Sequence, residues 1–266
     1  MMLTLERFIS QGIRPVKMLL KKALKKSCRI FKVSNHTFID ELGRAPVIVD
    51  LGAGQACFSG NMVERYEKPR MILVEPNPQN MELLSQRFKG KENISLLNAA
   101  VAGESRDKVT FYLSNNYECS SLEEGFAGKG GVPPPDRREI VVPMVTLGDI
   151  YALFVLERID LLKVDIEGAE WEMLDKFSPV DFQKISQITV EFHDFMDPSK
   201  RDRSESCIQR LKDLGYTAIF NRTSKIPYYD VLFYDRRRLK CGNILKWLNE
   251  RAVQYIFSEY GYIFKS

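Results

Sequence analysis

Ionisable side chains stand at the ends of two apolar segments in the second half of the chain. Lys163 and Asp165 alternate with apolar residues at the end of one segment, and Glu191 and His193 do so at the end of the other. If both segments are β-strands, the two-residue period places the members of each pair on one face. A histidine, whose ordinary pKa lies near neutrality, could then act as a general base, with Glu191 or Asp165 orienting its ring. Lys163 would neutralise the carboxylates.

The same residues are compatible with a structural role and with a metal site. A histidine at a strand end can be a packing residue, and a network of Asp, Lys and Glu can serve only to hold strand ends together. Asp165, Glu191 and His193 could instead hold a divalent metal that activates a substrate hydroxyl. Three dispersed ligands without a local motif do not define such a site, so the sequence predicts no bound metal.

A glycine-containing turn follows the first apolar segment of the central region. Residues 47–50 read as a buried strand that leads into Gly52 and Gly54, with a helix expected from about residue 56. Glycines at such a turn let the backbone approach a ligand and expose the N–H groups of the helix start. The third glycine of a G-x-G-x-x-G motif is absent, because Cys57 stands in its place. The turn alone is therefore a weak nucleotide signal.

An acidic residue at the end of the next strand strengthens that signal. Glu75 lies 25 residues after Asp50, where a carboxylate can bind both ribose hydroxyls of an adenosine. Together with Gly52 and Gly54, these two acids favour a ribose without a 2′-phosphate, which leaves S-adenosylmethionine and NAD as candidates. The alternative for Glu75 is a carboxylate that only caps the helix start after Pro76.

The order of the elements predicts an α/β domain, because strand-length apolar runs alternate with helical patterns. The predicted strands are Val47–Asp50, Met71–Glu75, Ile94–Asn98, Ile159–Asp165 and Ile185–Phe192. Two further β segments, Val109–Leu113 and Ile140–Val145, flank a glycine- and proline-rich loop over residues 120–136. Such a loop can close over a ligand or can be a surface insertion.

The last two predicted strands discriminate between the two candidate cofactors. Only a short turn-rich segment joins Tyr216–Asn221 to Tyr229–Tyr234, and no helix fits between them. The pair must therefore be antiparallel. A mostly parallel, Rossmann-like sheet that ends in an antiparallel hairpin is the architecture of class I methyltransferases, whereas a nicotinamide-binding domain ends in parallel strands. We therefore expect S-adenosylmethionine, with His193 taking the proton from an acceptor hydroxyl.

The same residues carry a family resemblance. The segments that carry it are VIVDLGAG at 47–54, VEPN at 74–77, NAAV at 98–101, Ser120–Ser121, VTL at 145–147 and, above all, LLKVDIEGAE at 161–170. In these segments the chain resembles the FkbM-type methyltransferases over about residues 45–193. The resemblance implies S-adenosylmethionine-dependent methyl transfer, usually to oxygen on sugars, polyketides or related metabolites. The chain departs from the family at Gln55–Ala56, where Asn-Ile or Asn-Val followed by Gly is common.

The resemblance also implies roles for individual residues. Asp50, Gly52 and Gly54 would line the methionine and ribose portion of the cofactor, and Glu75 would bind the ribose. The adenine would lie against Asn98, Ala99 and Ala100, and the transferring methyl group would face Asp165, Glu167 and Gly168. The acceptor, a small molecule or a glycan, is not identified. A methyltransferase-fold scaffold without turnover, or an NAD enzyme, remains the alternative function.

Composition bounds the remaining possibilities. With 44% hydrophobic residues among 266, the chain can bury a full core, which excludes a disordered protein. Five cysteines without a C-x-x-C pair fit neither a disulfide framework nor a zinc ribbon (Cys28, Cys57, Cys119, Cys207 and Cys241). Since no apolar stretch reaches membrane-spanning length and no signal peptide is visible, we expect a cytoplasmic protein.

Charge is concentrated at the start of the chain. Residues 1–33 hold nine Lys and Arg against Glu6 alone, so this segment carries +8 and the rest of the chain −4. The body therefore lacks a basic surface for nucleic acid. The apolar stripe of residues 16–31 predicts an amphipathic helix, which either docks on the domain or contacts an anionic membrane through residues 16–33. We accordingly expect a helical arm over 1–44, a methyltransferase domain over 45–236 and a helical tail over 237–266.

Overall fold

The structure is a computed structural model, and it describes residues 29–113, 120–122, 138–223 and 226–239. Nearly all of the predicted arm helix, most of the C-terminal tail and the larger part of the 120–136 loop lie outside these residues. The proposed roles of the arm at a membrane and of the loop as a lid therefore stay predictions. Within the described residues, no helix has both the length and the apolar character needed to cross a membrane.

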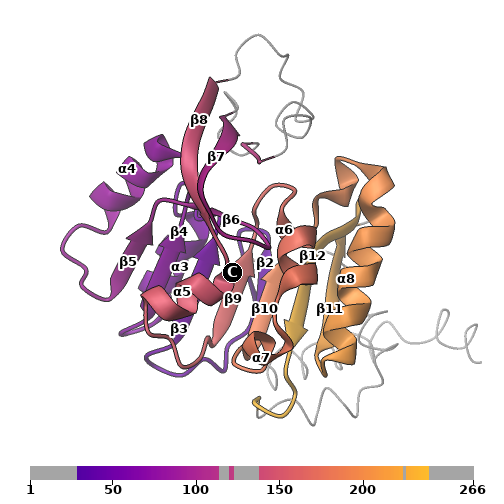
Figure 1. Cartoon of the computed structure of the whole chain (residues 1–266). Helices are drawn as coiled ribbons and strands as arrows, with labels where there is room; N and C mark the ends of the chain where they lie inside the picture. The colour runs from indigo at the N-terminus through magenta and orange to yellow at the C-terminus, as the bar shows by residue number, and fades with distance from the viewer. Residues whose placement is uncertain (1–28, 114–119, 123–137, 224–225, 240–266) are drawn as a thin grey trace, which may run out of the picture.

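A seven-stranded sheet forms the centre of the domain (Figure 1). Its spatial order is β11-β12-β10-β9-β3-β4-β5. The strands are β3 (Val47–Leu51), β4 (Arg70–Val74), β5 (Ile94–Leu97), β9 (Leu161–Val164), β10 (Gln187–Val190), β11 (Thr217–Thr223) and β12 (Ile226–Tyr234). β12 is antiparallel to both of its neighbours, β10 and β11, while the other pairings in the sheet are parallel. The predicted class I methyltransferase sheet with its antiparallel hairpin is confirmed.

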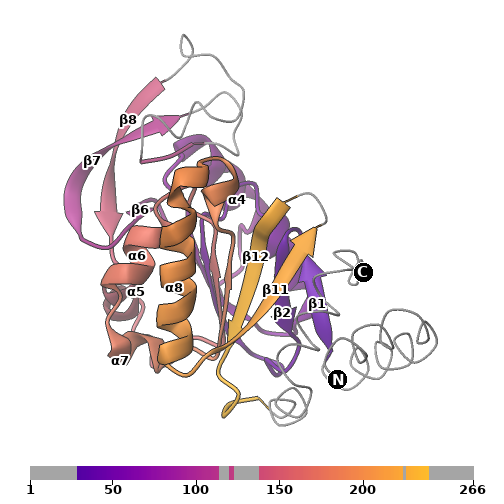
Figure 2. The same ribbon diagram turned by 90° about the vertical axis from the view of Figure 1, so that its right-hand side faces the viewer.

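Helices cover both faces of this sheet. They are α3 (Cys57–Arg65), α4 (Pro78–Arg87), α5 (Leu147–Leu153), α6 (Glu170–Lys176), α7 (Pro179–Phe182) and α8 (Arg201–Asp213). Two 3-10 turns, η2 (His193–Phe195) and η3 (Pro198–Lys200), follow β10. The later helices, α5 to α8, lie together on one side of the sheet (Figure 2).

The core explains why the strands read as continuous apolar runs. Alternate residues of one strand belong to different clusters: Ile72 and Val74 pack with α5, α6 and α8, whereas Met71 and Leu73 pack with α3 and α4. A strand that is covered on both faces needs apolar residues at every position. A charged residue within such an apolar run is therefore an exception that needs a buried partner. Asp50 in β3 and Lys163 in β9 are two such buried charged residues.

A small second sheet projects from the domain next to the loop. It consists of β6 (Ala100–Val101), β7 (Arg106–Leu113) and β8 (Arg138–Val145) in the order β6-β8-β7, with β7 and β8 antiparallel. The two predicted extra β segments lie inside β7 and β8. Figure 2 shows this ribbon extending beyond the central sheet.

An antiparallel hairpin precedes the central sheet, where we expected the helical arm to continue to residue 44. It is formed by β1 (Ile30–Val33) and β2 (His36–Ile39), joined at Ser34 with a φ of 52°. The hairpin docks through side chains of the central sheet, since Gln187 exchanges two hydrogen bonds of 2.8 Å with the backbone of Ile39. Burial of Phe38 and these long-range bonds favour a strand here, so the helical prediction was wrong for residues 30–39.

Candidate active site

A cavity of about 620 Å³ opens at the carboxyl ends of β3, β4, β9 and β10. Parallel sheets present their ligand sites at this edge, because the loops that leave the strands converge there. Most of the predicted cofactor residues line the cavity: Gly52, Gly54, Glu75, Ala99, Ala100 and Asp165. The other two, Asp50 and Asn98, are not among the lining residues. Asp50 pairs with Lys163, and Asn98 bonds to the backbone next to Glu75.

The turn after β3 requires glycine for a steric reason. Gly52 has a φ of +76°, and a Cβ built there would lie 1.8 Å from the backbone oxygen of Asp165. The N–H groups of Gly52 and Ala53 both donate to the Val74 oxygen, at 3.0 and 3.1 Å. The turn is therefore held between β4 and the segment after β9. Gly54 also has a positive φ, +51°, but a Cβ at this residue would meet no atom of a distant residue within 4 Å.

Replacing Gly52 with alanine is expected to damage the turn far more than replacing Gly54. Gly52→Ala adds an overpacking cost of about 1–3 kcal/mol to the left-handed backbone cost of about 1–2 kcal/mol, whereas Gly54→Ala carries only the latter. The free energy of unfolding from urea titration measures both. Equal losses in the two variants would contradict the contact between Gly52 and Asp165.

The Glu75 carboxylate accepts two backbone hydrogen bonds at the cavity wall. Gly54 N–H donates to Oε2 and Asn77 N–H to Oε1, both at 2.8 Å. Burial raises the pKa of Glu75, and these N–H groups oppose the rise. The side chain thus joins the glycine turn to the start of α4, as the helix-start alternative describes. Its role in binding a ribose stays a prediction. The Asn98 amide donates to the backbone oxygens of Glu75 and Pro76, at 2.8 and 3.0 Å, which supports this loop from behind.

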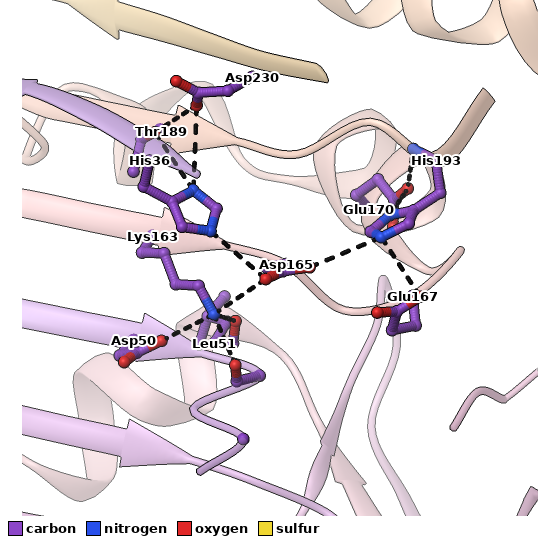
Figure 3. A network of polar contacts seen from close by, with 12 residues as sticks. His36, Asp50, Leu51, Lys163, Asp165, Glu167, Glu170, Thr189, His193 and Asp230 are labelled. Carbon is purple, nitrogen blue, oxygen red and sulfur yellow. Dashed lines mark hydrogen bonds and ion pairs between the residues drawn. The ribbon is translucent and has the colours of Figure 1, made fainter. Parts of the chain in front are cut away.

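Lys163 lies next to the glycine turn and points to the same side as Asp165, the residue after β9, as the strand period predicted. Its Nζ is 3.1 Å from Asp50 Oδ1 and 3.4 Å from Asp165 Oδ2, and it donates to the Gly52 oxygen at 2.5 Å (Figure 3). Burial acts to lower the pKa of Lys163, but the charges of Asp50 and Asp165 raise it above the ordinary value. For Asp165, burial acts to raise the pKa, and the charge of Lys163 lowers it well below its usual range.

His193 is held between acidic groups on both ring nitrogens. Its Nδ1 is 2.9 Å from Glu170 Oε1, and that same oxygen accepts from the His193 backbone N–H at 3.0 Å. Its Nε2 lies 3.3 Å from Glu167 Oε2 and 3.6 Å from Asp165 Oδ1. Burial acts to lower the pKa of His193, but the charges of Glu170 and Glu167 raise it well above 6.5. The ring is therefore a strong proton acceptor once it is neutral.

Glu170, which no sequence pattern indicated, provides a hydrogen bond that orients this histidine. The strand ends at Val190 and the chain enters η2 at His193, but Phe192 between Glu191 and His193 is extended. Glu191 and His193 both line the cavity, in agreement with the predicted two-residue period. Glu170 is fully buried in the first turn of α6. The Gly168 N–H donates to the other carboxylate oxygen of Glu170, Oε2, at 2.8 Å. This bond holds the carboxylate in place beside the His193 ring.

Glu191 lies in the cavity wall next to Asp165. Its backbone N–H donates to the Val164 oxygen at 3.0 Å, which continues the pairing of β10 with β9 by one residue. Its side-chain carboxylate lies within 4.8 Å of ligand atoms of His36 and Asp165. Burial, followed by the nearby charge of Asp165, raises the pKa of Glu191 to about 8.

His36 enters the site from the N-terminal hairpin, and no sequence signal identified it. Its Nε2 is 3.3 Å from Asp165 Oδ2, and its Nδ1 is 3.4 Å from Thr189 Oγ1 (Figure 3). Thr189 in turn donates to Asp230 Oδ1 at 2.7 Å. Asp165 therefore lies between two histidines, with His36 on one side and His193 on the other.

Comparison with known proteins identifies the family of this chain. The family model of the methyltransferase FkbM domain matches residues 50–218. The chain is 29% identical to methyltransferase sdnD of Sordaria araneosa over 183 residues, which cover 59% of this chain and 71% of sdnD. It is also 22% identical over 200 residues to the AMB antimetabolite synthetase AmbE of Pseudomonas aeruginosa; the match covers 64% of this chain but only 9% of AmbE.

Solved structures resemble the chain more distantly. The methyltransferase FkbM from Methylobacillus flagellatus is 15% identical with a TM-score of 0.46, and the match covers 72% of this chain and 44% of that one. Aeropyrum pernix fibrillarin, solved with natively bound S-adenosyl-L-methionine, is 10% identical with a TM-score of 0.41, over 72% of this chain and 67% of that one. The family match spans the glycine turn, Glu75, Asp165 and His193. The chain belongs to the FkbM methyltransferase family.

Proposed function

We propose that this methyltransferase uses S-adenosylmethionine and transfers the methyl group to a hydroxyl oxygen of a sugar, a polyketide or a similar small metabolite. The observation that carries the proposal is that one cavity is lined both by the glycine turn with Glu75 and by the acid-flanked His193. The first arrangement suits an adenosine cofactor, and the second suits removal of a proton. Nucleic acid is not the proposed acceptor, because the chain outside residues 1–33 carries a net charge of −4.

The residues of the cavity fit S-adenosylmethionine. Gly52 and Gly54 leave the turn without side chains, Glu75 offers carboxylate lone pairs beyond its two backbone bonds, and Ala99 with Ala100 presents a small apolar surface. When bound, the cofactor supplies an electrophilic methyl group on a positively charged sulfur. The carboxylates of Asp165 and Glu167 suit such a cation electrostatically.

His193 is the proposed general base. Its Nε2 accepts the proton of the acceptor hydroxyl, while Glu170 at Nδ1 orients the ring and stabilises the imidazolium that forms. Before a ligand binds, the carboxylates of Glu170 and Glu167 favour the protonated form of the His193 ring. A positive charge bound in the cavity lowers the pKa of the ring again and so favours the neutral form, which can accept the proton.

Calorimetry with S-adenosylhomocysteine and NAD, measured side by side, tests the cofactor. Saturable binding of S-adenosylhomocysteine without binding of NAD supports the proposal, and the reverse result would overturn it. Transfer of labelled methyl groups to matched hydroxyl- and amine-bearing sugars then tests the direction toward oxygen. Cofactor binding without transfer to any acceptor of a broad panel would favour the alternative, a scaffold that binds cofactor without turnover.

Glu75→Ala is expected to weaken S-adenosylhomocysteine binding by about 10- to 150-fold. The reason is that removal of a charged hydrogen-bond acceptor costs about 1.5–3 kcal/mol. Glu75→Gln keeps one oxygen acceptor and should lose less. Calorimetric affinity with a circular-dichroism check of folding measures the effect, and wild-type affinity in a folded Glu75→Ala protein would reject the ribose role.

A further inference from the structure

One carboxylate in the cavity wall lacks a partner. The side chain of Glu191 is 6% exposed and lines the cavity, yet it forms no hydrogen bond or ion pair with any other residue that the structure describes. A buried carboxylate is costly unless it meets a donor or a cation. The orphaned group faces the cavity, so a ligand entering the cavity can supply that cation.

Two other metal-ligating side chains lie beside Glu191. Ligand atoms of His36, Asp165 and Glu191 are all within 4.8 Å of one another. Imidazole nitrogens and carboxylate oxygens bind zinc tetrahedrally at about 2.0–2.2 Å, so ligand atoms of one ion lie about 3.4 Å apart. His36 Nε2 and Asp165 Oδ2 are already 3.3 Å apart. His36 belongs to β2, and Asp165 and Glu191 directly follow β9 and β10.

The Nδ1 atom of His36 faces a hydroxyl and a carboxylate, as the non-ligating nitrogen of a metal-binding histidine usually does. Its Nδ1 faces Thr189 Oγ1 at 3.4 Å and Asp230 Oδ1 at 3.9 Å, and Thr189 donates to the same Asp230 oxygen. A hydroxyl or carboxylate at one ring nitrogen fixes the orientation of the ring and presents the other nitrogen to the ion. Here the presented atom is Nε2, which lies on the side of Asp165 and the cavity.

The charge balance of the region also favours a cation. Lys163 forms ion pairs with Asp50 and Asp165, which leaves a surplus of negative charge among the surrounding acids. Six carboxylates belong to this cluster: Asp50, Asp165, Glu167, Glu170, Glu191 and Asp230. A divalent ion and a sulfonium together would not exceed that negative charge.

We propose that His36, Asp165 and Glu191 bind one divalent first-row transition-metal ion, such as Mn²⁺ or Zn²⁺, at the wall of the cavity. Asp165 also belongs to a second possible group with Glu167 and His193. In that group both ring nitrogens already face carboxylates, at 2.9 and 3.3 Å. In the His36 group, by contrast, the Glu191 side chain has neither a hydrogen bond nor an ion pair with another described residue.

The ion would hold the acceptor hydroxyl oxygen and lower the pKa of its proton, which His193 then accepts. This role rests on the proposed methyltransferase chemistry with a hydroxyl acceptor, whereas the existence of the ion site does not. It differs from the metal alternative drawn from the sequence, since His36 replaces His193 as the nitrogen ligand and His193 stays available as the base.

Titration of the full chain with Mn²⁺, followed by electron paramagnetic resonance of the free ion, tests the site without any activity assay. We expect one saturable Mn²⁺ per chain, with affinity lowered at least about tenfold in His36→Gln and in Glu191→Gln. His193→Gln is the matched control, and its affinity should stay within a few-fold of wild type. All three glutamine variants retain a polar side chain, and circular dichroism checks their folding.

Two results would overturn the site. One is the absence of saturable Mn²⁺ binding to the wild-type chain at millimolar concentration, and the other is loss of binding in His193→Gln with retention in His36→Gln. S-adenosylhomocysteine calorimetry on the same preparations separates the two proposals. A chain that binds Mn²⁺ but no S-adenosylhomocysteine would refute the proposed cofactor and leave the ion site standing, and the opposite pattern would refute the ion site alone.

Discussion

Replacing His193 with alanine is expected to lower the turnover number by about 10²- to 10⁴-fold, the usual effect of removing a general base. Cofactor affinity should stay near the wild-type value, because Glu75 and the glycine turn lie elsewhere in the cavity wall. Turnover should fall because the variant lacks the proposed proton acceptor. In the wild type, this ring lies between Glu170 on one side and Asp165 and Glu167 on the other. Single-turnover rates at saturating S-adenosylmethionine, together with calorimetric affinity for S-adenosylhomocysteine, separate the two effects.

Glu170→Gln is the matched variant for this prediction. It keeps an oxygen at Nδ1 but removes the charge that stabilises the imidazolium, so we expect a loss of rate smaller than that of His193→Ala. The measurements should be made on chelator-treated protein and again after addition of Mn²⁺. A His193→Ala enzyme within a few-fold of wild type in both conditions would eliminate the histidine as the base.

The largest effect on stability is expected at Lys163. Lys163→Met should lower the free energy of unfolding by about 3–5 kcal/mol, because it leaves a buried carboxylate without its counter-charge. Nζ is 3.1 Å from Asp50 Oδ1 in a region where both side chains are at most 4% exposed. Urea unfolding followed by tryptophan fluorescence measures the change.

Two further variants show whether the loss arises from the unpaired acid. Adding Asp50→Asn to Lys163→Met removes one of the stranded charges, so the double variant should lose less than the sum of the single losses. Lys176→Met breaks an exposed ion pair with Glu172 and should change stability little. A Lys163→Met protein as stable as Lys176→Met would refute the buried ion pair.

Much of the fold could be predicted because its signals are local. The five strands of the parallel region and the two strands of the terminal hairpin lie where apolar runs predicted them, since a strand covered on both faces must be apolar throughout. The short link between Tyr216–Asn221 and Tyr229–Tyr234 excluded a crossover helix, and β11 and β12 are indeed antiparallel. The prediction that Lys163 and Asp165 share a face was correct because the strand period extends from β9 into the residue that follows it.

The same rule placed Glu191 and His193 in the wall of one cavity, because Phe192 between them keeps an extended backbone after β10 ends at Val190. It did not identify Glu170 as a partner of the His193 ring. The hairpin at 30–39 was missed for a related reason. Its four-residue strands carry a weak pattern on their own and are stabilised by Gln187 and Asp230, which belong to strands far along the chain.

The sheet, the glycine turn and the set of polar residues at the carboxyl ends of the strands could be predicted, because each is encoded within a short segment. The pairing of those polar residues depends on tertiary contacts. These contacts bring His36 to Asp165 across 129 positions and Glu170 to His193 across 23. Such contacts depend on how a hairpin and a helix dock against the sheet, and docking is set by burial summed over many residues. No local pattern carries that information.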